Sequence, residues 1–265
     1  MQNRSRCGFV EAASRQKEGK DEMIISASRR TDIPACYGQW MMARLRAGEV
    51  LVPNPYNASR ISRVALSPGN VDCIVFWTKN AAPMLPLLDE LDALGYKYYF
   101  EYTVTGYGSA LEPGLPEKAR TVDTFLRLSE RLGPEGVDWR FDPVLLTSSI
   151  TPAWQLERFG ALCCALHGAT RRCVFSFADP YPGIRPSIAP LEETQMRLLA
   201  KGFADIAGEY GLPLYTCAEA VELSEYGIRH AACIDSAKVE RIAGYPIRVE
   251  KDPGQRPAWI PFYPD

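Results

Sequence analysis

The sequence has few of the residues that most protein metal centres need. Its 265 residues include only two histidines, His167 and His230, which excludes a site built from several imidazoles. None of its eight cysteines forms a Cys-x-x-Cys pair or the three-cysteine run of a cluster motif. Because the chain is large and shows no signal peptide, we expect thiols in a reducing cytoplasm rather than a disulfide framework.

Long apolar runs and an excess of one charge are also missing. No stretch approaches the roughly 20 apolar residues of a membrane span, so we expect no membrane partner. Thirty basic and thirty-two acidic residues give a net charge of −2. This balance gives no reason to expect a polyanion, and nucleic acid is a partner that the charge does not support. With 46% hydrophobic and 23% charged residues, the composition is that of a globular protein.

Composition divides the chain into three parts. Residues 1–22 are polar and charged with almost no apolar pattern, so we expect a disordered extension. Residues 23–250 are expected to form a single α/β barrel-like domain, which begins with the apolar run after Met23. Residues 251–265 contain four prolines, which predict an extended tail without regular structure.

Strand-like and helix-like segments alternate through the central part. Such alternation predicts parallel strands joined by helical crossovers. We therefore expect a TIM-like (β/α) barrel, closed, partial or open, with a doubly wound parallel sheet as the alternative. The expected strands are residues 24–28, 49–52, 61–66, 71–78, 96–105, 136–141, 172–177 and 214–217, and the expected helices are 33–48, 82–94, 116–132, 152–166, 191–210 and 220–226.

Polar and charged residues follow the expected strands at their carboxyl ends. In parallel α/β folds these ends form the binding or active site. Each residue alone also fits the cap of the next helix, above all Thr31 and Asp32. The expected ligand-binding residues are Ser28, Arg29, Arg30, Asn54, Thr78, Asn80, Thr103, Glu112, Arg140 and Asp179, and the expected catalytic residues are Lys79, Asp142 and Glu219.

Several of these side chains suit a small anionic ligand. Arg29 and Arg30 stand beside an expected helix start, where guanidinium groups and backbone N–H groups together form an anion cradle. Lys79 follows a buried strand, where it either holds a carboxylate or lies in solvent. Arg140 and Asp142 lie two residues apart and so share one face of a strand. A structural pairing of these two charges fits the pattern as well as a catalytic role does.

Two cysteines near the end of the expected domain are further candidates. Cys217 follows an apolar strand and is a candidate nucleophile or thiolate ligand, although the sequence places no histidine to activate it. Cys233 is the second candidate metal ligand.

Ordered motifs along the chain resemble those of the family called domain of unknown function 1848. The resemblance extends roughly from Met23 to Arg256, and the family has no established activity. Its Thr-Lys and Leu-Glu-Pro segments look like those of spore photoproduct lyase and related radical S-adenosylmethionine proteins, which are partial or full α/β barrels. The resemblance thus implies an iron–sulfur cluster and S-adenosylmethionine as cofactors. The matching stretches are residues 24–35, 54–55, 76–80, 102–107, 111–113, 139–143, 216–219 and 233–235.

The resemblance ends before the cysteine-rich tail in which members of that family typically continue. That tail follows a Gln-Arg pair, here Gln255 and Arg256, and it resembles an iron–sulfur site. In this sequence, residues 257–265 contain no cysteine. Because a cluster needs three or four thiolates, we expect no cluster of the chain's own, as in a truncated or frameshifted copy or a member that has lost the cluster.

Three functions follow as hypotheses from these observations. The first is a barrel enzyme of radical-S-adenosylmethionine-like ancestry that binds an anionic small molecule or nucleotide-like substrate at the strand ends. The second is a cluster-independent enzyme with acid–base or lyase-type chemistry. The third is a catalytically silent ligand-binding protein, which ligands stabilise without any turnover.

Overall fold

A computed structural model describes residues 10–17, 20–27, 31–54, 57–178, 190–217 and 219–247, with the backbone alone at 10–22 and at Ala58. The chain groups into two compact units. The first holds the described residues up to Tyr102 together with those from Ser236 onward, and the second holds Thr103–Asp235. The expected single domain at 23–250 stays a prediction.

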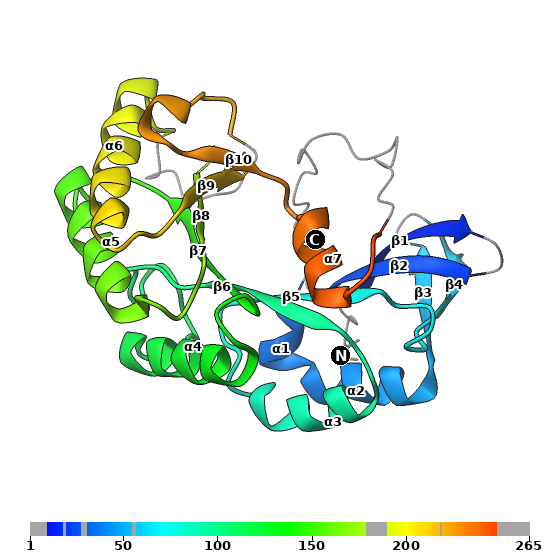
Figure 1. Ribbon diagram of the computed structural model, residues 1–265. Helices are drawn as coiled ribbons and strands as arrows, with labels where there is room; N and C mark the ends of the chain where they lie inside the picture. The colour runs from blue at the N-terminus through cyan, green and yellow to red at the C-terminus, as the bar shows by residue number, and fades with distance from the viewer. Residues whose placement is uncertain are drawn as a thin grey trace. The chain divides into compact units, whose positions relative to one another are not determined.

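Strands β1, β2, β5 and β6 are hydrogen-bonded in that order in the first unit (Figure 1). The pair β1–β2 is antiparallel, whereas β2–β5 and β5–β6 are parallel. Strand β1 lies in the stretch whose composition predicts no regular structure. Pairing with β2 satisfies its backbone groups whatever its side chains are. The bounds are β1 Val10–Lys17, β2 Lys20–Ala27, β5 Cys73–Thr78 and β6 Tyr98–Thr103.

Helices and a separate hairpin complete the first unit. The single helix expected at 33–48 is two helices, because Tyr37, with φ of −133°, leaves the helical conformation between them. Strands β3 and β4 pair antiparallel in a two-stranded sheet. The bounds are α1 Ile33–Cys36, α2 Gly38–Ala47, β3 Glu49–Asn54, β4 Asn57–Ala65, η1 Leu85–Leu87, α3 Leu88–Ala93 and α7 Ser236–Ala243.

Both faces of β5 and β6 are covered within the first unit. Phe76 and Phe100 stack with ring centroids 5.0 Å apart on one face, and helix α1 lies against β5. Because side chains alternate along a strand, Tyr99 points to the other face. There the ammonium of Lys238 on α7, a residue only 2% exposed, lies 4.5 Å from the centroid of the Tyr99 ring.

The second unit carries four parallel strands in the order β7-β8-β9-β10. Val104, directly after β6, donates its backbone N–H to the Arg140 carbonyl of β7 at 2.9 Å. The helix expected at 220–226 is only the short turn η2, and β10 follows it. The bounds are α4 Lys118–Leu132, β7 Val137–Val144, α5 Pro152–Leu166, β8 Cys173–Phe177, α6 Glu193–Glu209, β9 Leu214–Cys217, η2 Ser224–Tyr226 and β10 Arg229–Ala231.

Helices α5 and α6 lie along one side of these strands (Figure 1), and an aromatic cluster joins them to β7 and β8. The Phe159 ring of α5 lies 5.2 Å from Trp139 and 4.5 Å from Phe203 of α6, centroid to centroid. Phe175 of β8 lies 5.5 Å from Phe203. The odd-numbered residues of β7 therefore face the helices, and its even-numbered residues, Arg140 among them, face away.

Parallel strands linked through helices in both units confirm the expected α/β class. In the part of the chain that the structure describes, no helix combines the length and the apolarity needed to cross a membrane.

Candidate functional site

Asp32 joins the start of α1 to the end of β5 in the first unit. It is the N-cap of α1, as the sequence predicts, and its Oδ1 accepts the backbone N–H of Ala35 at 2.9 Å. The same carboxylate accepts the Thr78 hydroxyl at 2.8 Å and the backbone N–H of Lys79 at 2.8 Å. Burial raises the pKa of Asp32 above its ordinary value, against the lowering effect of these hydrogen bonds.

Replacing Asp32 by alanine is expected to lower the free energy of unfolding by about 1–3 kcal/mol, since two backbone N–H groups lose their acceptor. Because the pKa of Asp32 is raised in the folded protein, its protonation favours folding at acid pH. That contribution is lost as the pH rises from the ordinary 3.8 through the folded value. In urea unfolding, the difference in free energy of unfolding between wild type and variant should therefore become smaller as the pH rises.

The control for this prediction is an exposed carboxylate. Asp123 of α4 is exposed and pairs with Arg127, also exposed, at 3.9 Å, so Asp123→Ala should change the free energy of unfolding by less than about 0.5 kcal/mol. If the loss in free energy of unfolding caused by Asp32→Ala stayed the same at every pH, the raised pKa assigned to Asp32 would be wrong.

The other candidates of the first unit have local roles or lie outside the description. Thr78 accepts the backbone N–H of Asn80 at 2.9 Å, and the Asn80 side chain accepts from Ala82 at 3.2 Å, which orders the loop after β5. Asn54 ends β3, where its side chain accepts the backbone N–H of Asn57 at 3.1 Å, so it belongs to the antiparallel hairpin and not to a parallel strand end. Ser28, Arg29 and Arg30 lie outside the described residues.

Arg140 and Asp142 form an ion pair near the carboxyl end of β7. The Nε and Nη2 atoms of Arg140 donate to Oδ2 of Asp142 at 2.8 and 2.6 Å, and the Thr103 hydroxyl donates to Oδ1 at 3.3 Å. The Arg140 side chain is 7% exposed and that of Asp142 is 17% exposed. The β7–β8 register shifts between Phe141 and Val144, an irregularity of the kind that re-aims side chains near active sites.

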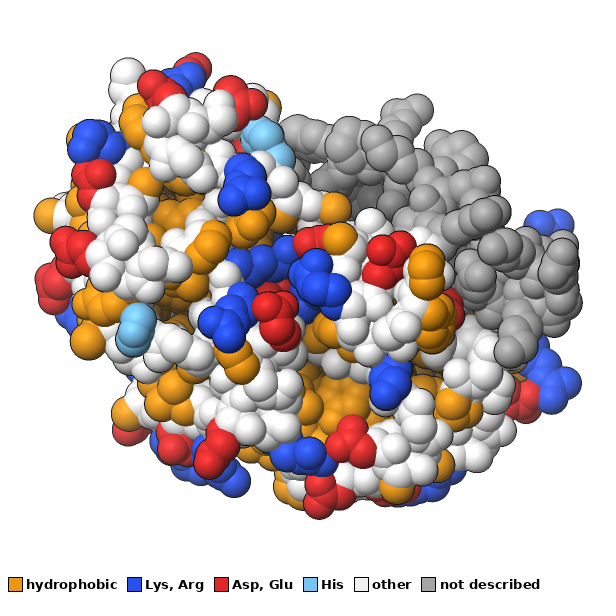
Figure 2. All heavy atoms as spheres, viewed as in Figure 1, with side chains coloured by type: hydrophobic (Ala, Val, Ile, Leu, Met, Phe, Trp, Pro, Cys, Tyr) orange, Lys and Arg blue, Asp and Glu red, His pale blue; other side chains and the backbone are white. Residues whose placement is uncertain are grey.

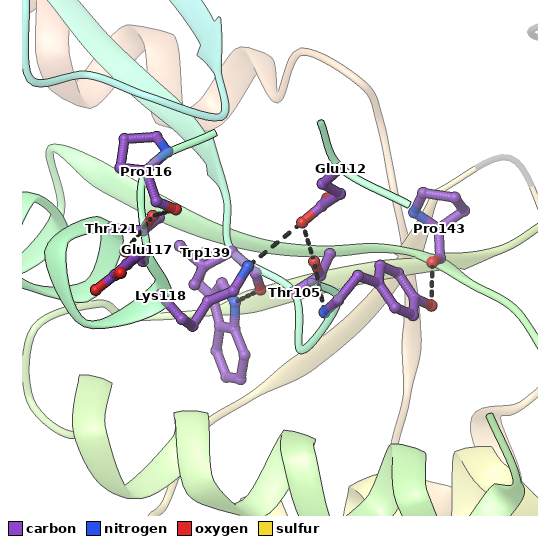
Figure 3. A network of polar contacts seen from close by, with 10 residues as sticks. Thr105, Glu112, Pro116, Glu117, Lys118, Thr121, Trp139 and Pro143 are labelled. Carbon is purple, nitrogen blue, oxygen red and sulfur yellow. Dashed lines mark hydrogen bonds and ion pairs between the residues drawn. The ribbon is translucent and has the colours of Figure 1, made fainter. Parts of the chain in front are cut away.

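Glu112 is a second buried carboxylate of this unit (Figure 3). Its Oε2 accepts the Thr105 hydroxyl at 2.7 Å and the Lys118 ammonium at 3.3 Å. The same segment is tied to β7, since the indole of Trp139 donates to the Val104 carbonyl at 2.9 Å. Glu112 thus orders the chain between β6 and α4.

Tyr107 ties the same segment to the chain after Asp142. Its hydroxyl donates to the Pro143 carbonyl at 2.8 Å and accepts from the Gln155 side chain at 2.9 Å. Burial raises the pKa of Tyr107 to about 12, so this hydroxyl stays protonated at neutral pH.

Two further candidates lie at and just after the end of β9. Glu219 accepts the backbone N–H of Phe177, the last residue of β8, at 2.7 Å. Cys217 ends β9, and its sulfur lies 3.2 Å from that of Cys233. The hydrogen bond with Cys233 and burial raise the pKa of Cys217, while the Arg140 guanidinium beside it opposes this shift. Asp179 lies outside the described residues.

The structure therefore brings together part of the set expected from the sequence. Thr103, Arg140 and Asp142 meet directly, and Cys217 lies beside Arg140. Glu112 belongs to a network with Thr105 and Lys118.

Comparison with known proteins identifies the family but no activity. The model of a family described as domain of unknown function (DUF1848) matches residues 24–259. The chain belongs to this family. The resemblance inferred from its motifs is thus confirmed. No curated protein matches the chain. Among solved structures, a candidate alpha-L-fucosidase from Bacteroides thetaiotaomicron is similar over 68% of this chain and 76% of its own, at 10% identity and a TM-score of 0.31, which carries no functional argument.

The described residues of this DUF1848 protein do not fit an iron–sulfur cluster. Within the described ranges, no group of three or more His, Cys, Asp or Glu side chains converges as a metal site would. The close pair Cys217–Cys233 offers two thiols, whereas a cluster is held by three or four. No catalytic step is therefore assigned to a cluster.

A buried charge cluster at the opposite ends of the strands was not expected from the sequence. Arg172, just before β8, donates to Asp138 of β7 at 2.8 Å and to Asp235 at 2.7 Å. It lies at the amino ends of the strands, where such contacts serve stability rather than catalysis. The one sign of this cluster in the sequence is Arg172 itself, an arginine directly before an apolar strand.

Charges at the surface are mixed in sign. On the face drawn in Figure 2, Lys and Arg side chains lie next to Asp and Glu side chains. This matches the net charge of −2 and gives no support to a nucleic-acid partner.

Proposed function

We propose that this DUF1848 protein is an enzyme that binds a small anionic molecule at the carboxyl ends of the parallel strands of its second unit. The observation that carries the proposal is the ion pair of Arg140 and Asp142 on the face of β7 that points away from the aromatic core. Removing two charges from water costs several kcal/mol per ion, and the core beneath them does not need the pair. Costly charges at strand ends are typical of functional sites.

Arg140 is the proposed anion-binding group. Its guanidinium, paired with Asp142, is a cation near the carboxyl end of β7, at the strand edge where parallel α/β folds bind ligands. The planar group matches the oxygens of a carboxylate or phosphate in a way that a lysine does not.

Asp142 is the proposed acid–base group. Among the described residues, its Oδ2 receives two Arg140 hydrogen bonds, at 2.8 and 2.6 Å, and its Oδ1 receives the longer one from Thr103 at 3.3 Å. Oδ1 is therefore the atom we assign to proton transfer with a bound ligand. Glu219, two residues after β9, accepts from the last residue of β8 and is a further carboxylate of this strand edge.

The same proposal includes a partial TIM-like barrel of radical-S-adenosylmethionine-like ancestry. Strands β7 to β10 follow one another in chain order within one parallel run, which supports a barrel. A doubly wound sheet fits as well, and both architectures place ligands at the carboxyl ends of the strands. Lys79 stays a candidate of the first unit.

The proposal is tested by thermal unfolding against a panel of small carboxylates and phosphates. A ligand at 100 times its dissociation constant stabilises a protein by about 2.7 kcal/mol. We expect Arg140→Lys to lose most of this stabilisation, because the bidentate contact is lost, and Asp142→Asn to keep binding while losing turnover.

The control is Arg127→Lys on α4, whose cation belongs to an exposed pair with Asp123 and should respond to ligands as wild type does. Equal ligand responses of wild type and Arg140→Lys would overturn the assignment of the anion site. If a carboxylate or phosphate stabilised the protein but was never converted to a product, the protein would be a catalytically silent ligand-binding protein instead.

A further inference from the structure

Two thiols face each other at the end of β9. The sulfurs of Cys217 and Cys233 lie 3.2 Å apart, and neither residue is in a disulfide. A disulfide bond is about 2.05 Å long, so closure requires a movement of roughly 1 Å. The two residues are 16 positions apart in the sequence, and their contact is a product of the fold.

Strand pairing explains how the two cysteines meet. In the parallel pair β9–β10, Cys217 lies opposite Ala231. Cys233 follows Ala231 by two positions, in the bend after β10, where its sulfur lies beside that of Cys217. The sheet thus holds one thiol beside the other.

The two thiols differ in exposure in a way that suits sequential reaction. Cys233 is exposed, whereas Cys217 is buried, with the Arg140 guanidinium beside it. An exposed thiol meets a reagent first, and a nearby cation stabilises a thiolate. The hydrogen bond with Cys233 and burial raise the pKa of Cys217, as burial raises those of Cys73 and Cys163. The assignment of Cys217 therefore rests on its 3.2 Å contact with the Cys233 sulfur and not on its pKa.

We propose that Cys217 and Cys233 are a redox-active dithiol site that exchanges with small-molecule disulfides such as oxidised glutathione. The inference rests on the thiol geometry alone and does not depend on the proposed enzymatic function.

The exchange proceeds in two thiol–disulfide steps. The thiolate of Cys233 attacks one sulfur of the small disulfide, which forms a mixed disulfide and releases one small thiolate that takes the Cys233 proton. The thiolate of Cys217 then attacks the Cys233 sulfur, breaks the mixed disulfide and releases the second small thiolate, which takes the Cys217 proton. Overall, the protein loses two protons and two electrons, and the small disulfide is reduced to two thiols.

The test uses the whole chain, first reduced and then incubated with oxidised glutathione. After alkylation of the remaining thiols, we expect Cys217 and Cys233 to be protected from alkylation, no glutathione on either of them, and one cross-linked peptide pair containing both. Reduced glutathione in excess should restore both thiols. A wild-type chain that keeps both thiols, or that holds glutathione stably on Cys233, would overturn the proposal.

Variants separate the two steps. Cys217→Ser leaves the exposed thiol without its partner, so glutathione should stay bound to Cys233, and Cys233→Ser should abolish the cross-link. Cys36→Ser is the matched control, because Cys36 is an exposed thiol of the first unit and its loss should leave the cross-link unchanged. A cross-link that survives Cys233→Ser would contradict the assignment, and the wild-type peptide map keeps the test valid if a serine variant fails to fold.

Discussion

Replacement of Phe159 by alanine is expected to lower the free energy of unfolding by about 3–5 kcal/mol. Phe159 is completely buried, and its ring lies between Trp139 of β7 and Phe203 of α6, with centroid distances of 5.2 and 4.5 Å. Truncation leaves a cavity among large rings that only partly relax, and it removes aromatic pairs that add to the burial of apolar area. The shift in the midpoint of guanidinium unfolding, at an unchanged slope, measures the loss.

Leu198 of α6 is the control for this substitution. It is a large apolar residue on a neighbouring helix, but it is 57% exposed, so Leu198→Ala should stay within about 0.5 kcal/mol of wild type. If the two variants lost equal stability, the aromatic cluster would not be the main support of the second unit.

Removing the cation of the buried charge cluster should have an effect of similar size. Arg172→Met is expected to cost about 3–5 kcal/mol, because Asp138, itself 1% exposed, would keep a buried charge without its cation. Denaturant unfolding at neutral pH measures the loss. The double variant Asp138→Leu with Arg172→Met should recover much of it, since a well-packed apolar pair often replaces a buried ion pair at little cost.

The same experiment separates structural from functional charges. Arg172 lies at the amino ends of the strands, and Arg140 lies toward the carboxyl ends. Arg172→Met should therefore lower the free energy of unfolding but leave the stabilisation by an anionic ligand unchanged. Arg140→Lys should reduce that stabilisation. A double variant less stable than Arg172→Met alone would show that the remaining cost lies in packing rather than in charge.

Much of the fold was predictable because its signals are local. Helix α5 has the expected bounds, since Thr151 caps it and Pro152 occupies its first turn. Strand β9 also has the expected bounds, because its four residues stand between turn residues and a polar loop. Strand β10 and helix α7 were not expected from the sequence: β10 has only three residues, two of them exposed, and α7 is short and amphipathic.

Parts of the candidate site were predictable to the extent that they depend on strand periodicity. Arg140 and Asp142 share a face because they are two residues apart, and this was expected. The link from Asp32 to Thr78, 46 positions away, was not, because a helix cap gives no sign of a distant partner. Cys217 and Cys233 stood out only as separate thiols for the same reason.

The order in which the chain is made has a consequence for folding. The first unit needs α7, since Lys238 is buried against Tyr99 and the Tyr245 hydroxyl donates to Asp72 at 2.7 Å. Those residues are synthesised only after Thr103–Asp235, the described part of the second unit. At about 5–20 residues per second, the Tyr99 face waits roughly 7–28 seconds for its covering helix. The unit encoded later is therefore expected to finish folding first on the ribosome.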